Sequence, residues 1–344
     1  MASKRKKTSS PPSDRSKLSS FLKWSGGDVF VLVAGMGLTA FSGWQSYTSP
    51  GPLSTDQDIV VPHGNYATTL SALQNAGVVP TNWWSSRVFS IALVLTRRDG
   101  QLHAAELHFP AYASIEQTLW ILRHGKPVQH KLTIPEGLTA WQIQTLIQAA
   151  PLLTGDTPLP EEGSTLPQTY TYLRNSSRKD LLVHMQTSMA QTLKQVWAER
   201  ESGLPLSNPQ ELLTLASVIE KETAQPDERP SVARVFYNRL QKNMKLQTDP
   251  TVIYAITQGK PPLDRPLTHT DLQTVSPYNT YVYTGLPPGP ICSPGKAALE
   301  AAAHPAKGDM LYFVANGTGG HNFAATLGDH NHNVLLLRKQ KTSH

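Results

Sequence analysis

The sequence predicts an α+β protein with one membrane anchor at its N-terminus. Three observations predict this class. Residues 29–47 are free of charge and mostly apolar, residues 58–159 alternate short strand and helix patterns, and residues 160–344 combine a long helical pattern with loops rich in Pro and Gly. A chain of 344 residues, 39% hydrophobic and 16% charged, is long enough to form two folded domains.

The net charge of +6 comes from the start of the chain. The first 27 residues carry seven lysines and arginines against Asp14, so the rest of the chain is neutral overall. A protein whose folded part binds nucleic acid would carry its basic residues in that folded part and not in the tail. The charge distribution therefore argues against nucleic acid as a partner and predicts a basic cytoplasmic tail at residues 1–28.

The apolar stretch at residues 29–47 predicts a transmembrane helix. Its most apolar part, Val29–Phe41, is short against the ~20 residues of a usual span, and Trp24, Trp44 and Tyr47 stand where interfacial aromatic residues lie. Positive charge before the stretch and none directly after it places the tail inside. A cleavable signal peptide is the alternative, which the long basic leader disfavours. We therefore predict a single-pass protein of the inner (plasma) membrane.

The region after the anchor has the pattern of small βα units. A linker marked by Pro and Gly covers residues 48–57, and the predicted subdomain covers residues 58–159. The predicted strands are Ile59–Pro62, Phe89–Leu95 and Lys131–Pro135, and the predicted helices are Ala67–Ala76, Ser114–Leu122 and one that Thr139 opens. No motif for chemistry lies here, so we expect a scaffold or a carbohydrate-binding unit.

A second helix pattern carries a candidate catalytic acid. Asn208-Pro209 is a favourable helix start for the run LLTLASVIEKETA, Leu212–Ala224. At helical spacing Glu222 falls on the apolar side, where partial desolvation raises the pKa of a carboxyl group and suits it to act as a general acid. Glu220 falls on the other flank of the apolar face, so the helical pattern alone does not choose between the two glutamates.

Several polar, turn-rich motifs follow this helix. They are RPSVARVFYNRL (Arg229–Leu240), LQTDPTVIYAI (Leu246–Ile256), SPYNTY (Ser276–Tyr281), GLPPGPICSPG (Gly285–Gly295) and LYFVANGTGGHNF (Leu311–Phe323). Rigid loops bearing Asn, Tyr, Thr, Gln and Asp side chains are what a sugar-binding groove uses.

In their order along the chain, these motifs resemble those of the endolytic murein transglycosylases, the YceG-like family. ASVIEKET, NRL, LQTDPTVIY, YNTY, GLPPGPI, AAAHPAK and GGHNF follow the family's order between Leu212 and Val334 without large insertions. The resemblance implies a LysM-like α/β subdomain at residues 58–159. It also implies a mixed α+β catalytic domain of the YceG-like type at residues 160–344, which the anchor would hold in the periplasm.

The resemblance also implies a reaction. Glu222 would protonate the β-1,4 bond between N-acetylmuramic acid and N-acetylglucosamine, and would then take a proton from the muramyl 6-hydroxyl. The product is a 1,6-anhydromuramyl end, and strand elongation stops. The candidate substrate-binding residues are Asn238, Gln247, Thr248, Asp249, Tyr278 and Asn279. No metal or cofactor is implied; the implied partners are peptidoglycan glycan strands and the glycan-strand polymerases (penicillin-binding proteins).

The chain departs from the family pattern in two places. EGSTLPQTY, Glu162–Tyr170, has Gln168 where the family usually has Asp, and ELHFPAY, Glu106–Tyr112, replaces a Gly-x-Tyr strand. Both departures lie outside the segment around Glu222, so they concern the groove and glycan preference and not the reaction.

Four alternative interpretations of the sequence stay open. Asp249 could act as the second carboxylate of a peptidoglycan hydrolase. His321, His330 and His332 could bind a metal, and the only cysteine, Cys292, could be a nucleophile. The chain could also be a non-catalytic peptidoglycan-binding scaffold.

Overall fold

The computed structural model describes residues 26–260 and 263–342 and divides into two compact units, residues 1–128 and 129–344. Residues 1–25 of the predicted basic tail lie outside the described residues. The sequence interpretation placed the domain boundary after residue 159. The structure groups residues 129–159 with the second unit, because strand β3 (His130–Thr133) pairs antiparallel with strand β4 (Thr169–Tyr172).

Helix α1 (Gly26–Thr48) is the apolar N-terminal helix that the sequence predicts. It has 23 residues, and its segment Gly27–Thr48 is long and apolar enough to cross a membrane. Large apolar side chains such as Phe30 and Leu38 are exposed along it. Exposed apolar surface of this extent suits contact with lipid, so α1 is a candidate membrane anchor.

The rest of the first unit packs helices around a two-stranded sheet. Its elements are β1 (Gln57–Val60), α2 (Tyr66–Asn75), α3 (Trp83–Leu95), η1 (Arg97–Asp99), β2 (Glu106–Phe109) and α4 (Ile115–His124). Strands β1 and β2 are antiparallel, with Gln57 opposite Phe109, and the core contains Leu73, Phe89 and Leu119. The predicted LysM-like character of this unit stays a prediction.

One predicted element of this unit is wrong: Phe89–Leu95 is part of helix α3 and not a strand. The side chain of Asn82 caps the helix by accepting a hydrogen bond from the Ser85 backbone N–H. The buried residues Val88, Phe89, Ala92 and Leu93 follow helical spacing. The continuous apolar run suggested a strand because periodicity does not separate a short buried strand from a buried helix.

The second unit is mostly helical. Its elements are β3, α5 (Ala140–Ala149), β4, α6 (Arg178–Glu199), α7 (Pro209–Glu222), η2 (Pro226–Glu228), α8 (Arg229–Gln241), α9 (Asp249–Thr257), η3 (Asp271–Gln273), α10 (Lys296–Ala303), β5 (Tyr312–Ala315), β6 (His321–Ala324) and α11 (Leu327–Thr342). Strands β5 and β6 form a hairpin in which Ala315 lies opposite His321. The predicted mixed α+β class is confirmed.

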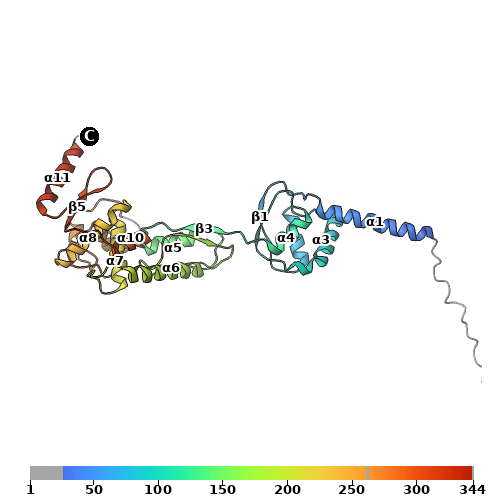
Figure 1. Cartoon of the computed structure of the whole chain (residues 1–344), viewed down its shortest axis with the longest axis horizontal. Helices are drawn as coiled ribbons and strands as arrows, with labels where there is room; N and C mark the ends of the chain where they lie inside the picture. Colours follow the sequence, from blue (N-terminus) through green and yellow to red (C-terminus); the bar gives the residue numbers. More distant parts are fainter. Residues whose placement is uncertain (1–25, 261–262, 343–344) are drawn as a thin grey trace, which may run out of the picture. The chain divides into compact units, whose positions relative to one another are not determined.

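Helix α7 is the centre of the second unit's core. It packs against α8 and α10 (Figure 1), and every residue from Leu212 to Ile219 is buried. Its one buried serine is satisfied as well, because the Ser217 hydroxyl donates to the Thr214 carbonyl at 2.7 Å and accepts from the Ile291 N–H at 3.0 Å. Helix α7 is therefore fixed by its packing, and its last residue, Glu222, has a fixed backbone position.

Candidate active site

Glu222 lies in a cleft of the second unit with a volume of about 270 Å³. The residues that line this cleft are Glu222, Arg239, Leu246, Gln247, Asp249, Tyr281, Phe313, Val314, Ala315 and His321. They come from α7, α8, α9, the two strands β5 and β6, and the segments before α9 and after η3. The fold thus brings together side chains from across some 100 residues of the chain.

The Glu222 carboxylate is held by a hydrogen bond from Thr248. Its Oε1 accepts from the hydroxyl of Thr248, the residue that precedes α9. Thr248 is fixed in turn, because its backbone N–H donates to Thr280 Oγ1 at 3.1 Å and its carbonyl accepts from the Thr251 hydroxyl at 2.7 Å. This buried threonine network orients the carboxylate toward the cleft.

Burial raises the pKa of Glu222 to about 7. The Thr248 hydrogen bond lowers the pKa, the negative charge of Asp249 raises it, and the electrostatic effects of His321 and Arg239 lower it. A carboxyl group that titrates near neutral pH can give a proton in one step and take one back in the next. Glu222 therefore has the property that a combined acid and base requires.

Glu220, which the helical pattern did not separate from Glu222, has a different place. One oxygen pairs with Arg229 at 3.2 Å and the other accepts the Gly295 N–H at 3.0 Å. Its side chain is only 6% exposed, and burial raises its pKa. Arg229 is the first residue of α8 and Gly295 caps α10, so Glu220 links α7 to both helices. Glu222 is the glutamate that lines the cleft.

Three of the predicted substrate-binding residues lie around Glu222. Gln247 and Asp249 line the cleft and are exposed, and Thr248 holds the Glu222 carboxylate. Gln247 has a φ of 51°, a left-handed backbone conformation that is uncommon for a residue other than Gly. Their contact with substrate stays a prediction.

The other three are not among the described residues that line the cleft. Asn238 donates to the carbonyls of the loop before β5, and the Tyr278 ring packs on the Tyr254 ring at 4.8 Å between centroids. Asn279 is fully buried and donates to the carbonyls of Leu272 and Thr274. In this structure they support the loops of the site.

Two cleft residues, Arg239 and Tyr281, were not among the sequence candidates. The Arg239 guanidinium donates to the carbonyls of Leu246 and Leu311, each at 2.7 Å, and the Tyr281 hydroxyl donates to Asp249 Oδ1 at 2.7 Å. Burial lowers the pKa of Arg239, and burial together with the Asp249 hydrogen bond raises that of Tyr281. Arg239 belongs to the NRL motif and Tyr281 to the YNTY motif. In both motifs the sequence candidates were neighbouring residues, Asn238 in the first and Tyr278 and Asn279 in the second.

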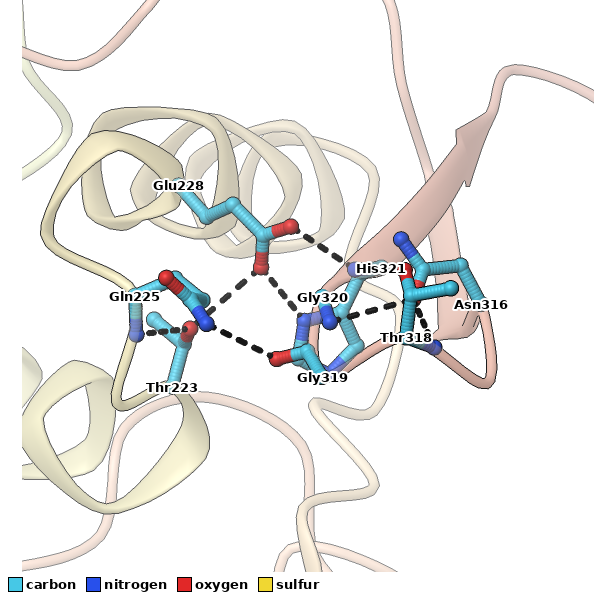
Figure 2. Close-up of polar contacts among 8 residues, drawn as sticks. All are labelled: Thr223, Gln225, Glu228, Asn316, Thr318, Gly319, Gly320 and His321. Carbon is cyan, nitrogen blue, oxygen red and sulfur yellow. Dashed lines mark hydrogen bonds and ion pairs between the residues drawn. The ribbon is translucent and has the colours of Figure 1, made fainter.

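A cluster of polar contacts joins the segment after α7 to the β5–β6 hairpin (Figure 2), and its residue His321 lines the cleft. One Glu228 oxygen accepts the His321 backbone N–H and the other lies 2.7 Å from the His321 ring nitrogen Nδ1. The Thr223 hydroxyl donates to Glu228 at 3.3 Å, and the Gln225 amide donates to the Gly319 carbonyl at 3.3 Å. Burial of Glu228 opposes ionisation, but the hydrogen bonds from His321 outweigh it and lower the pKa.

Two of the alternative sites gain no support from this geometry. Among the described residues, no cluster of three or more His, Cys, Asp and Glu side chains is placed to hold a metal ion, and His330 instead stacks on Tyr312. Cys292 is fully buried, and its thiol donates to the Ser217 carbonyl at 3.3 Å. Because burial raises the pKa of the thiol, Cys292 does not form the thiolate that a nucleophile needs.

The sequence profile of the YceG-like family matches residues 59–335, most of the chain. The chain belongs to the YceG-like family. A crystal structure of a yceG-like protein from Listeria monocytogenes is 31% identical, with a TM-score of 0.52, and the match covers 80% of this chain and 98% of that one. The family explains why the motifs occur in this order and places the cleft within the matched region.

Two curated relatives of this YceG-like chain are named endolytic murein transglycosylase. The one from Bacillus subtilis is 43% identical over 176 residues, 50% of this chain and 46% of the relative. The one from Streptococcus pneumoniae is 36% identical over 194 residues, 55% of this chain and 34% of the relative. The match thus spans less than half the length of each curated relative.

Proposed function

We propose that this YceG-like protein is a peptidoglycan lytic transglycosylase with Glu222 as its acid and base. The observation that carries the proposal is a partly buried carboxyl group with a pKa raised to about 7, fixed at the end of a buried helix and facing an open polar cleft. The names of the curated relatives supply the substrate class, the glycan strands of peptidoglycan.

In the proposed reaction Glu222 first gives its proton to the glycosidic oxygen between N-acetylmuramic acid and N-acetylglucosamine. The bond from the muramyl anomeric carbon to that oxygen breaks. The Glu222 carboxylate then takes the proton of the muramyl 6-hydroxyl, whose oxygen bonds to the anomeric carbon. Water does not enter, Glu222 ends protonated as it began, and the strand gains a 1,6-anhydromuramyl end.

A two-carboxylate hydrolase is the second candidate, because Asp249 lines the same cleft as Glu222. The two functions differ in their product. We expect purified peptidoglycan, digested with the full-length chain in detergent, to yield fragments whose masses carry the anhydromuramyl end. Reducing ends one water heavier would establish the hydrolase instead, and intact glycan strands would leave a binding scaffold.

The pKa of Glu222 predicts the pH profile. Because the first step needs the protonated form, kcat/KM should fall tenfold per pH unit once the pH rises above about 7, where Glu222 ionises. The measurement is the initial rate of fragment release between about pH 5 and 9. A rate that stays constant across neutral pH would contradict the role of Glu222 as the acid.

Replacing Asp249 with Asn should separate the two candidate functions. The charge of Asp249 raises the pKa of Glu222, so its removal should move the fall in kcat/KM to lower pH while the anhydromuramyl product stays. If Asp249 is a second catalytic carboxylate, the variant should instead lose about 10²–10⁴-fold in kcat. The Asn side chain still accepts the hydrogen bond of Tyr281, so the cleft should keep its shape.

The candidate anchor and the charge pattern support a membrane location for this reaction. Helix α1 would span the inner membrane with the basic tail in the cytoplasm and the cleft in the periplasm, close to where new strands are made. Cleavage there would end strand elongation. The same location would bring the protein near the glycan-strand polymerases. A protease added to right-side-out spheroplasts should remove residues after the anchor and leave the tail intact.

A further inference from the structure

His321 combines two properties that its place at the start of β6 does not require. It lines the cleft together with Glu222, and its ring is fixed from behind by Glu228 (Figure 2). The side chain is 16% exposed and its ring packs edge-on against Phe313 at 5.3 Å. A histidine needed only to shape the hairpin would not have to reach the cleft.

The contact with Glu228 determines which ring nitrogen carries the proton. An ionised carboxylate can only accept hydrogen bonds, so His321 Nδ1, 2.7 Å from Glu228 Oε2, must be the donor. The second Glu228 oxygen accepts the backbone N–H of the same histidine at 2.7 Å. With both oxygens engaged by one residue, the ring can neither turn over nor change tautomer without losing a charge-assisted hydrogen bond.

The hairpin loop behind His321 is itself fixed. Asn316 Oδ1 accepts the backbone N–H groups of Thr318 at 2.9 Å and Gly320 at 3.0 Å. The Gln225 amide donates to the carbonyl of Gly319. These bonds join the loop before His321 to the segment that follows Glu222, so the histidine and the glutamate are held in one frame.

With Nδ1 bonded to Glu228, Nε2 is the ring nitrogen left for a further hydrogen bond, and in the tautomer that carries its proton on Nδ1 it is an acceptor. No described residue donates to Nε2 of His321, whereas glycan strands are rich in hydroxyl donors. We propose that His321 is a substrate-positioning residue, whose Nε2 accepts a hydrogen bond from a glycan hydroxyl, and that Glu228 positions its ring. The inference rests on the proposed function for the identity of the substrate.

Two variants of His321 separate this role from a structural one. In His321→Asn the amide nitrogen replaces Nδ1 and still donates to Glu228, but nothing stands at the place of Nε2. In His321→Gln the longer side chain carries a polar atom near the place of Nε2. We expect kcat/KM of the Asn variant to fall about 10²-fold with an unchanged melting temperature, and the Gln variant to retain more activity.

An Asn variant that cleaves peptidoglycan at the wild-type rate would overturn the proposal, because the contact with Glu228 would then be all that His321 supplies. If the Asn variant has a lowered melting temperature, the proposal is tested on the wild type instead, by ¹⁵N spectra of the chain labelled at histidine. The His321 signal is assigned as the one that is lost in His321→Gln. A proton on Nδ1, and an Nε2 shift on adding a muramyl oligosaccharide, are expected; a proton on Nε2, or no shift, would overturn the proposal.

The product assay keeps this test apart from the proposed function. If wild-type digests contain reducing ends, the transglycosylase reaction fails while the variant comparison still applies, because the contact is made to the glycan and not to a particular step. Glu228→Gln provides the matching change at the other partner. A Gln side chain has one acceptor oxygen for three donors, the His321 backbone N–H, His321 Nδ1 and the Thr223 hydroxyl. The ring should therefore lose its fixed tautomer, and kcat/KM should fall as it does in the Asn variant.

Discussion

Replacing Glu222 with Gln should lower kcat by about 10³-fold or more, because general acid–base catalysis is worth 10²–10⁴ per step and Glu222 serves two steps. Gln keeps the length of the side chain and an oxygen that can accept the Thr248 hydrogen bond. It has no proton to give at the pH of the assay. The measurement is the appearance of anhydromuramyl fragments by mass spectrometry under conditions where the wild type digests to completion.

The same variant should be more stable than the wild type at neutral and alkaline pH. The folded-state pKa of Glu222, about 7, lies above the unfolded value of 4.5, so the folded wild type loses stability as the pH rises from 4.5 to 7. A Gln side chain does not ionise, so the variant does not lose stability in this way. A Gln variant that is inactive because it is unfolded would melt earlier, and full activity in a well-folded Gln variant would remove Glu222 from the reaction.

Replacing Glu220 with Ala should destabilise the second unit by about 3 kcal/mol, the lower end of the cost of breaking a buried ion pair. The change leaves Arg229, only 9% exposed, with the Glu136 carboxylate at 3.6 Å as its remaining partner. It also removes the acceptor for the Gly295 N–H. For a unit of this size we expect a melting temperature lower by roughly 6–12 °C, followed by circular dichroism of the full-length chain in detergent.

The residue between the two glutamates provides a matched control. Lys221 is exposed and makes one long contact with the Gly137 carbonyl at 3.4 Å, so Lys221→Ala should change the melting temperature little. The Glu220→Ala, Arg229→Met double variant should recover part of the loss, since no buried charge is then unpaired. Equal melting temperatures for the Glu220 and Lys221 variants would mean that the ion pair contributes nothing to stability.

The local signals of the sequence were sufficient to predict several helix starts. Asn208 and Pro209 begin α7, and Thr139 with Gln142 forms a capping box at the start of α5, because these residues satisfy the free N–H groups of the first turn by themselves. For helix α3 the apolar run Phe89–Leu95 decided the prediction of a strand, and the cap residue Asn82 was overlooked.

The cleft could be predicted only in part. Glu222 and its neighbours in LQTD lie close together because α7 and α9 pack against each other, and the family motifs contain both. Choosing Arg239 over Asn238, or Tyr281 over Asn279, requires knowing which way each side chain leaves its backbone. That direction is set by tertiary packing, since residues one or two positions apart point to different sides of the same element. His321 was considered only as a metal ligand because its partner Glu228 is 93 residues away.

The place of Glu222 as the last residue of α7 has a further consequence. The aligned peptide dipoles of a helix give its C-terminal end a partial negative charge, which favours cations and disfavours a carboxylate. Proteins usually put acidic residues at the opposite end. Here the backbone of α7 itself opposes loss of the proton, and it does so with groups that no side-chain substitution can remove. The acid strength of Glu222 is therefore set partly by the direction in which the chain runs through the core.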